Sequence, residues 1–191
     1  MNKINIGDYV TAIRDIGKIK QQAVGLVRDV VVNDVTVFFV GTGRIIKVDY
    51  KLLAYLDIKK TGKPYVIKIC NICHILKNMS EFDINQTDAQ GRKTTRPSCR
   101  ICRKDIDGVR LKPSEKKKLD AIKPKDIFTC PICKKTTIVG VTANLVRDHN
   151  HLTGNARTWI CDSCNTGLGR FRDDISLFEA VIEYLKSFDD Q

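Results

Sequence analysis

The stretch that decides the fold lies between residues 130 and 170. It opens with C-P-I-C at 130–133 and continues with R-D-H-N-H-L-T-G-N-A-R-T-W-I-C-D-S-C-N-T-G-L-G-R at 147–170. Tetrahedral zinc takes four ligands, and a CxxC pair supplies two thiolates from one tight turn. The two pairs therefore predict one zinc site, formed by Cys130, Cys133, Cys161 and Cys164. Because four thiolates leave no coordination position for a substrate, we expect this zinc to be structural.

The side chains expected to carry chemistry lie between and just after the two cysteine pairs. An imidazole titrates near neutral pH, so His149 is the candidate general base. Asp148 and Asn165 offer oxygen ligands, which suit Mg²⁺ better than zinc. The alternative for His149 is a zinc ligand or a buried structural histidine, and the full cysteine shell argues against the first. Since adjacent strand residues point to opposite faces, Asp148 and His149 require a local bend to serve one site.

The residues around this cluster have more than one interpretation. His151 either orients the phosphate or supports the ribbon, and Asn150 is expected to bond the backbone across its loop. The candidate phosphate clamps are Arg157, Arg170 and Arg172, with surface solvation as the alternative. Trp159 is expected in the core.

The motif D-H-N-H-L-T-G, together with Arg157 and C-D-S-C-N-T-G-L-G, resembles the HNH (ββα-metal) nucleases, most closely the recombination endonuclease VII branch. The eight cysteines, the preceding ribbon and the overall size are similar to a type II restriction endonuclease of this class. One departure is Thr158, where the family often has Gly. The resemblance implies a two-stranded ribbon that carries Asp148 and His149 and a helix near Cys161 that presents Asn165. It also implies one Mg²⁺ between Asp148 and Asn165, with Mn²⁺ as a substitute.

A second cysteine set precedes the first stretch and has nearly the same layout. Its ligands are Cys70, Cys73, Cys99 and Cys102, with 25 residues between the pairs against 27 in the later set. This is an internal repeat that predicts a second structural zinc. Alignment on the last pairs puts Gln86, Thr87 and Arg103 where Asp148, His149 and Asn165 stand, so the first copy is expected to be catalytically degenerate. His74 is read as an ordinary polar residue.

The charge of the chain predicts a polyanionic partner. The formal net charge is +11, and two zinc–tetrathiolate sites at about −2 each leave roughly +7. Residues 92–125 hold thirteen Lys and Arg residues against four Asp and Glu residues, which favours phosphate binding over a merely solvated face. The candidate DNA contacts in this segment are Arg92, Lys93, Arg96, Arg100, Arg103, Lys104, Lys116, Lys117 and Lys118.

The cellular setting is read from what the sequence lacks. Residues 1–3 lead into no apolar core of a secretion signal, and no apolar run approaches the roughly 20 residues of a membrane span. Paired CxxC motifs without a secretion signal favour zinc over disulfides. We therefore expect a cytoplasmic protein with no membrane partner.

The fold class predicted from these patterns is α+β. β-branched runs at 9–13, 24–32, 35–40 and 44–48, broken by Asn-Asp and Gly-Thr-Gly, predict a small antiparallel β-barrel over residues 1–57. The first zinc-ribbon repeat is assigned to 58–112. The second repeat, with the nuclease motif and a C-terminal helix, is assigned to 113–191. Helices are expected from a Ser114 N-cap to about 122 and over 173–188.

The function favoured by the sequence is a Mg²⁺-dependent, sequence-specific endonuclease of double-stranded DNA, a type II restriction enzyme with two structural zinc ions. A homodimer is expected, because one active site per chain does not cut both strands of a symmetric site at once. Two alternatives stay open. One is a structure-specific endonuclease that resolves branched DNA, and the other is a non-catalytic zinc-ribbon DNA-binding factor.

Overall fold

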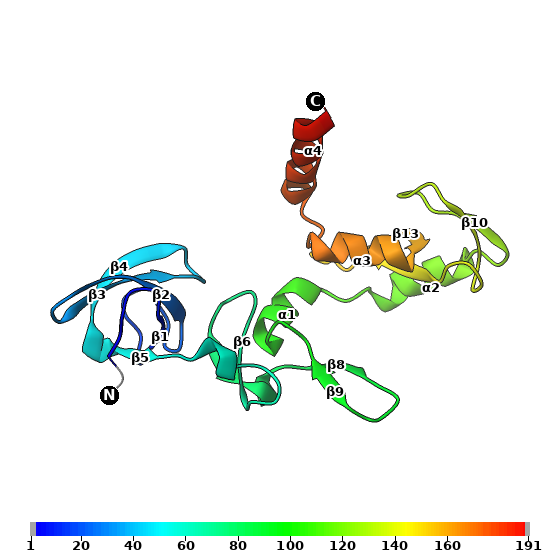
Figure 1. Cartoon of the computed structure of the whole chain (residues 1–191). Helices are drawn as coiled ribbons and strands as arrows, with labels where there is room; N and C mark the ends of the chain where they lie inside the picture. The colour runs from blue at the N-terminus through cyan, green and yellow to red at the C-terminus, as the bar shows by residue number, and fades with distance from the viewer. Residues whose placement is uncertain (1–2, 190–191) are drawn as a thin grey trace. The chain divides into compact units, whose positions relative to one another are not determined.

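The computed structural model describes residues 3–189 (Figure 1). The chain divides into two compact units after Lys104, and each unit is described by itself. No helix in the described range is long and apolar enough to cross a membrane.

The first unit begins with a five-stranded antiparallel sheet. Its strands are β1 (Tyr9–Ala12), β2 (Val24–Val31), β3 (Asp34–Phe39), β4 (Arg44–Asp49) and β5 (Leu53–Tyr55), in the order β4-β3-β2-β1-β5. Alternate residues of these strands are buried, because successive side chains of a strand point to opposite faces. Val10, Val27, Val37 and Phe39 form the centre of that core. The predicted strands are confirmed to within about two residues at each end.

The predicted closed barrel is not found. The strands at the two ends of the order, β4 and β5, are not paired with each other among the described residues. β5 is only three residues long and follows a short 3₁₀ turn at Tyr50–Leu52, so it covers little of the sheet edge. The antiparallel, β-rich character of the region is confirmed, and its closure is not.

The N-terminal cysteine set, Cys70, Cys73, Cys99 and Cys102, is carried by two hairpins and a helix. These elements are β6 (Ile67–Ile69), β7 (Leu76–Asn78), β8 (Ile84–Thr87), β9 (Lys93–Thr95) and α1 (Arg100–Asp107), with 3₁₀ turns at Ile58–Lys60 and Met79–Glu81. The turn between β6 and β7 also joins the five-stranded sheet, since the Val24 amide donates to the His74 carbonyl at 2.9 Å.

The second unit repeats this plan and adds two helices. In chain order it contains α2 (Pro113–Ala121), β10 (Ile127–Thr129), β11 (Thr136–Ile138), β12 (Leu145–His149), β13 (Ala156–Cys161), α3 (Asp162–Arg170) and α4 (Ile175–Asp189). β12 and β13 form an antiparallel ribbon, and α3 packs against both strands. This ribbon and helix are the unit that the resemblance to the HNH nucleases implies.

The turns at the start of the two copies contain the same backbone hydrogen bond. His74 N donates to Cys70 O at 3.0 Å, and Lys134 N donates to Cys130 O at 3.0 Å. His74 (φ 51°) and Lys134 (φ 61°) both occupy the left-handed region. The copies also end their ribbons alike, because Thr87 closes β8 as His149 closes β12. The internal repeat is therefore present in the structure, and His74 fills the left-handed position of its turn.

Helix α2 packs against the β12–β13 ribbon. Leu119 is buried, and its carbonyl accepts a 2.8 Å hydrogen bond from Trp159 Nε1. Arg147 Nε donates to Asp120 Oδ1 at 2.6 Å beside this contact. Trp159 is only 3% exposed, so it is a core residue, as expected.

Two helix starts differ from the sequence-based expectation. Helix α2 begins at Pro113 with Lys112 at the N-cap, so Ser114 is not the cap. The reason is that proline is favoured at the first helical position, where a missing N–H costs nothing. Helix α4 begins at Ile175 rather than at Asp173, and the Asp174 carboxylate accepts the Ser176 amide at 2.9 Å.

Candidate active site and zinc centres

Each cysteine set gathers into one cluster. In both, the four sulfur atoms lie within 4.8 Å of one another, and all eight cysteines are free. The Sγ atoms of Cys133 and Cys161 are 3.8 Å apart. A tetrahedron with Zn–S bonds of about 2.3 Å has edges of about 3.8 Å, whereas a disulfide bond is about 2.05 Å long. The geometry therefore fits two four-cysteine zinc sites.

The acidity of the thiols also fits metal binding. Burial opposes ionisation of Cys130, but amide donors from Cys161, Cys133 and Ile132 outweigh it and lower the pKa of its thiol to about 6. The pKa of Cys70 is lowered to about 6 in the same way. Burial and S–H donation to neighbouring sulfurs raise the pKa of Cys164 to about 12. One thiol in each cluster therefore ionises more easily than a free cysteine, and a metal ligand must be deprotonated.

The ribbon that carries the motif is irregular where the chemistry is expected. Arg147 pairs with Trp159 and His149 pairs with Ala156, so the register shifts across Asp148 and β13 has one residue more than β12. Such a bulge bends the ribbon and re-aims the side chains beside it. This is the local bend that the sequence requires if Asp148 and His149 are to serve one site.

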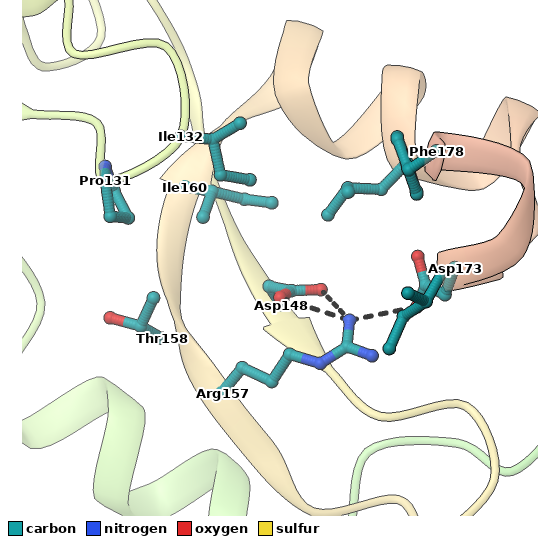
Figure 2. Close-up of a pocket in the computed structure, with 10 residues that line it drawn as sticks. Pro131, Ile132, Asp148, Arg157, Thr158, Ile160, Asp173 and Phe178 are labelled. Carbon is teal, nitrogen blue, oxygen red and sulfur yellow. Dashed lines mark hydrogen bonds and ion pairs between the residues drawn. The ribbon is translucent and has the colours of Figure 1, made fainter. Parts of the chain in front are cut away.

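Asp148 lies at the register shift and is 6% exposed. Arg157 Nη1 donates to its two carboxylate oxygens at 3.3 and 3.4 Å, and to Asp173 Oδ2 at 2.9 Å. Figure 2 shows the guanidinium of Arg157 between the two carboxylates. Burial disfavours the charged form of Arg157, and the two acids outweigh that effect, so the pKa of Arg157 is raised. Arg157 is therefore engaged within the site rather than free on the surface.

A pocket of about 380 Å³ opens over Asp148. It is lined mainly by apolar side chains, and its polar members are Asp148, Arg157, Thr158 and Asp173. The apolar side chains come from the Cys130–Cys133 turn, β13, α3 and α4. They are Pro131, Ile132, Ile160, Leu168, Ile175 and Phe178 (Figure 2). The carboxylate of Asp148 thus meets solvent through a largely apolar opening.

His149 lies at the end of β12 beside a second histidine. The rings of His149 and His151 have centroids 4.7 Å apart and are tilted by 51°. His149 Nε2 lies 3.2 Å from the carbonyl oxygen of Val109. The structure therefore brings the two histidines together and gives one nitrogen of the candidate base a backbone partner.

The loop after His149 is held by Asn150. Its Oδ1 accepts the amides of Leu152 at 2.7 Å and Thr153 at 3.1 Å, and its own amide donates to Asn155 O at 2.9 Å. These bonds tie the loop to itself, in keeping with the structural role expected for Asn150.

Asn165 is exposed in the first turns of α3 and does not line the pocket over Asp148. Its helix packs on the ribbon through Cys164 and Leu168. Arg170 ends α3, and Arg172 lies in the left-handed region between α3 and α4 with φ 56°. Arg170 and Arg172 are exposed.

The basic residues of segment 92–118 expected to contact DNA divide into three sets. Arg92, Arg100 and Lys118 are paired with Asp88, Asp83 and Glu115. Lys93, Lys104, Lys116 and Lys117 are exposed, whereas Arg96 and Arg103 are half-buried. Lys93, Lys104, Lys116 and Lys117 form no ion pair with another described residue, so they can bind a polyanion without breaking one.

Two residues of the site were not identified from the sequence. Val109 contacts His149 through its backbone carbonyl, and residue type gives no indication of a backbone contact. Asp173 was assigned to the start of the last helix, and only its place opposite Arg157 connects it with the site. A single acidic residue eight positions past Asn165 carries no motif that could have singled it out.

Two family descriptions match overlapping parts of the chain. Residues 57–108 match the His-Me finger endonuclease beta4-alpha2 domain, and residues 105–187 match recombination endonuclease VII. A crystal structure of the ββα-Me type II restriction endonuclease Hpy99I is 58% identical to this chain, with a TM-score of 0.93. The match covers 97% of this chain and 100% of that chain. This chain belongs to the ββα-Me type II restriction endonucleases.

Membership of the ββα-Me restriction endonucleases confirms the resemblance drawn from the D-H-N-H motif. It also excludes the alternative of a non-catalytic zinc-ribbon factor. Among curated proteins, no significant match is found.

Proposed function

We propose that this chain is a Mg²⁺-dependent type II restriction endonuclease that cuts double-stranded DNA at a short specific sequence. The observation that carries the proposal is the likeness to Hpy99I over nearly the whole chain, combined with Asp148 and His149 on a bent ribbon under a helix that bears Asn165. Both zinc ions are structural, since all four positions of each site are taken by sulfur.

In this proposal His149 takes the proton from the attacking water. Its half-buried ring lies at the end of β12, and its contact with Val109 occupies only one of its two nitrogens. The other nitrogen is the proton acceptor.

Asp148 and Asn165 are the residues that would hold the divalent ion. The donor set fits Mg²⁺, because a carboxylate and an amide carbonyl are oxygen ligands with no preference for a soft metal. A divalent ion there supplies positive charge for the phosphate and the leaving 3′-oxygen, and Mn²⁺ is expected to replace Mg²⁺. Arg157 Nη1 lies 3.3 Å from Asp148 Oδ1 and helps to fix the direction of this carboxylate.

The remaining regions position the substrate. We assign DNA binding to the first repeat at 58–112 and to Lys116 and Lys117, and a clamping or dimer role to residues 1–57. A homodimer places one active site on each strand of a symmetric sequence. The catalytic repeat in this division is 113–191.

The test is to incubate the protein and Mg²⁺ with a linear duplex library and with a four-way junction. We expect discrete products from the duplex at one sequence. Cleavage confined to the junction would instead support a branch-resolving endonuclease.

A further inference from the structure

A segment outside the nuclease motif lies along the loop that follows His149. The Val109 amide donates to His151 O at 2.7 Å, and the Lys112 amide donates to Gly154 O at 3.0 Å. Lys112 Nζ also donates to Asn155 Oδ1 at 2.8 Å. Residues 108–112 therefore run beside residues 151–155 and are bonded to them at both ends. We call residues 108–112 the strap.

Two glycines make this close approach possible. Gly108 has φ +57°, and a side chain on it would collide with the carbonyl oxygen of His151. Gly154 is buried with φ +70°, and a Cβ there would lie 2.6 Å from Arg110 O and 3.0 Å from Val109 Cγ1. Each position thus needs both the left-handed conformation and the absence of a Cβ. The strap and the loop meet at their backbones because neither glycine places a side chain between them.

The docked strap delivers one acceptor to the candidate base. With its amide held by His151, Val109 presents its carbonyl oxygen 3.2 Å from His149 Nε2. A carbonyl only accepts hydrogen bonds, so the nitrogen that faces it carries the proton. In the neutral ring, Nδ1 is then the unprotonated nitrogen, with a lone pair for the attacking water. The ring of His151, 4.7 Å away, limits the freedom of His149 on another side.

We propose that the strap is a positioning element for the general base, and that Gly108 and Gly154 are the positioning residues that let it dock. The strap sets which nitrogen of His149 holds the proton and fixes the direction of the ring. This inference rests on the proposed function in one respect, which is that His149 is the base.

The experiment compares Gly108→Ala with Gly140→Ala. Gly140 lies in the same unit and has φ +76°, but a Cβ there meets nothing within 4 Å. Both variants carry the cost of a left-handed alanine, and only Gly108→Ala pushes the strap away from the loop. With enzyme saturating the DNA, we expect the single-turnover cleavage rate of Gly108→Ala to fall about 10²-fold, the scale of a displacement of about 1 Å. Because the enzyme saturates the DNA, this rate does not depend on the affinity for DNA. Gly140→Ala should cut at the wild-type rate.

A second variant and a direct readout guard against a simple folding defect. We call the contact between the strap and residues 151–155 the seam. Gly154→Ala disturbs this seam from the loop side, and we expect the same loss of rate with zinc content unchanged. Long-range ¹H–¹⁵N correlations of the His149 ring, measured without DNA above the range where histidine titrates, report the protonated nitrogen. We expect Nε2–H in wild type and Gly140→Ala, and a mixture of tautomers in the two seam variants.

Wild-type cleavage by Gly108→Ala, or an equal loss in Gly140→Ala, would overturn the positioning role, as would an unchanged ring tautomer in both seam variants. Failure of the proposed function looks different. If His149→Ala still cuts DNA, the base has been assigned wrongly, while the tautomer measurement still reports whether the strap holds the ring.

Discussion

Arg157 and Asp173 form a 2.9 Å ion pair in which Asp173 contributes a side chain only 12% exposed. The same Nη1 atom of Arg157 is 3.3 Å from Asp148, so the closer partner of the guanidinium is the acid that is not a proposed metal ligand. Arg172 and Asp173, with φ 56° and 54°, form the left-handed turn that brings this second acid into place. Asp173 thereby shares the charge of Arg157 and leaves more of the charge of Asp148 to a cation.

Asp173→Asn is expected to weaken divalent-metal binding. Without its charged partner, Arg157 should shift its full interaction onto Asp148, which then attracts a metal ion less strongly. We expect the Kd for Mn²⁺, followed by electron paramagnetic resonance in the absence of DNA, to rise about five- to tenfold, a change of about 1–1.4 kcal/mol. Asp174→Asn is the matched control, because it removes the neighbouring charge while keeping a good helix cap. Equal Kd values in the two variants would show that Asp173 is only a structural anchor.

Zinc should be required for the fold of each repeat. Elemental analysis is expected to give two zinc ions per chain, separate from any exchangeable Mg²⁺. Cys70→Ser and Cys130→Ser should each lose one ion and unfold part of the chain, since the energy of ligand bonds is folding energy in such sites. Both cysteines are fully buried. A measured content of one zinc or none in the wild-type protein would contradict two structural sites.

The two zinc sites could be predicted because the spacing of their cysteines is a local feature of the sequence. Two CxxC pairs at similar intervals specify both clusters, and equal backbone turns at Cys70 and Cys130 follow from equal ligand geometry. The bend at Asp148 was predictable for another reason. Consecutive Asp and His on a strand conflict with its alternation, and the β-bulge resolves the conflict.

What the sequence did not predict depends on contacts between segments far apart in the chain. The approach of Val109 to His149 spans 40 residues and uses a backbone atom. Arg157 was predicted as a phosphate clamp or a solvated surface residue, and its ion pair with Asp173 was not predicted, because Asp173 lies 16 residues away, in the turn after α3. The predicted barrel is not confirmed, because strand patterns give the number and length of the strands but not the pairing of the two end strands.

Lys116→Gln and Lys117→Gln should weaken DNA binding for all sequences alike. If each lysine contacts a phosphate, each change should reduce the slope of log K against log salt by about 1. Lys118→Gln is the comparison on the same helix, and its smaller effect is expected because Lys118 is already paired with Glu115. The measurement is fluorescence anisotropy across a salt series on specific and non-specific duplexes. An unchanged slope in both Lys116 and Lys117 variants would mean that this run is a solvated face.

The roles inside the active site separate by their response to metal. His149→Ala should slow single-turnover cleavage by about 10²–10⁴-fold or more with DNA affinity nearly unchanged, because a general base acts in the transition state. Asp148→Ala should also block cleavage, but through the loss of a metal ligand, so we expect partial recovery at high Mn²⁺. His149→Ala should not recover. Thr87→Ala is the matched control, because Thr87 closes β8 at the position that His149 holds in β12. A Thr87→Ala variant as inactive as His149→Ala, or a His149→Ala variant that cuts at the wild-type rate, would move the catalytic centre to the other repeat.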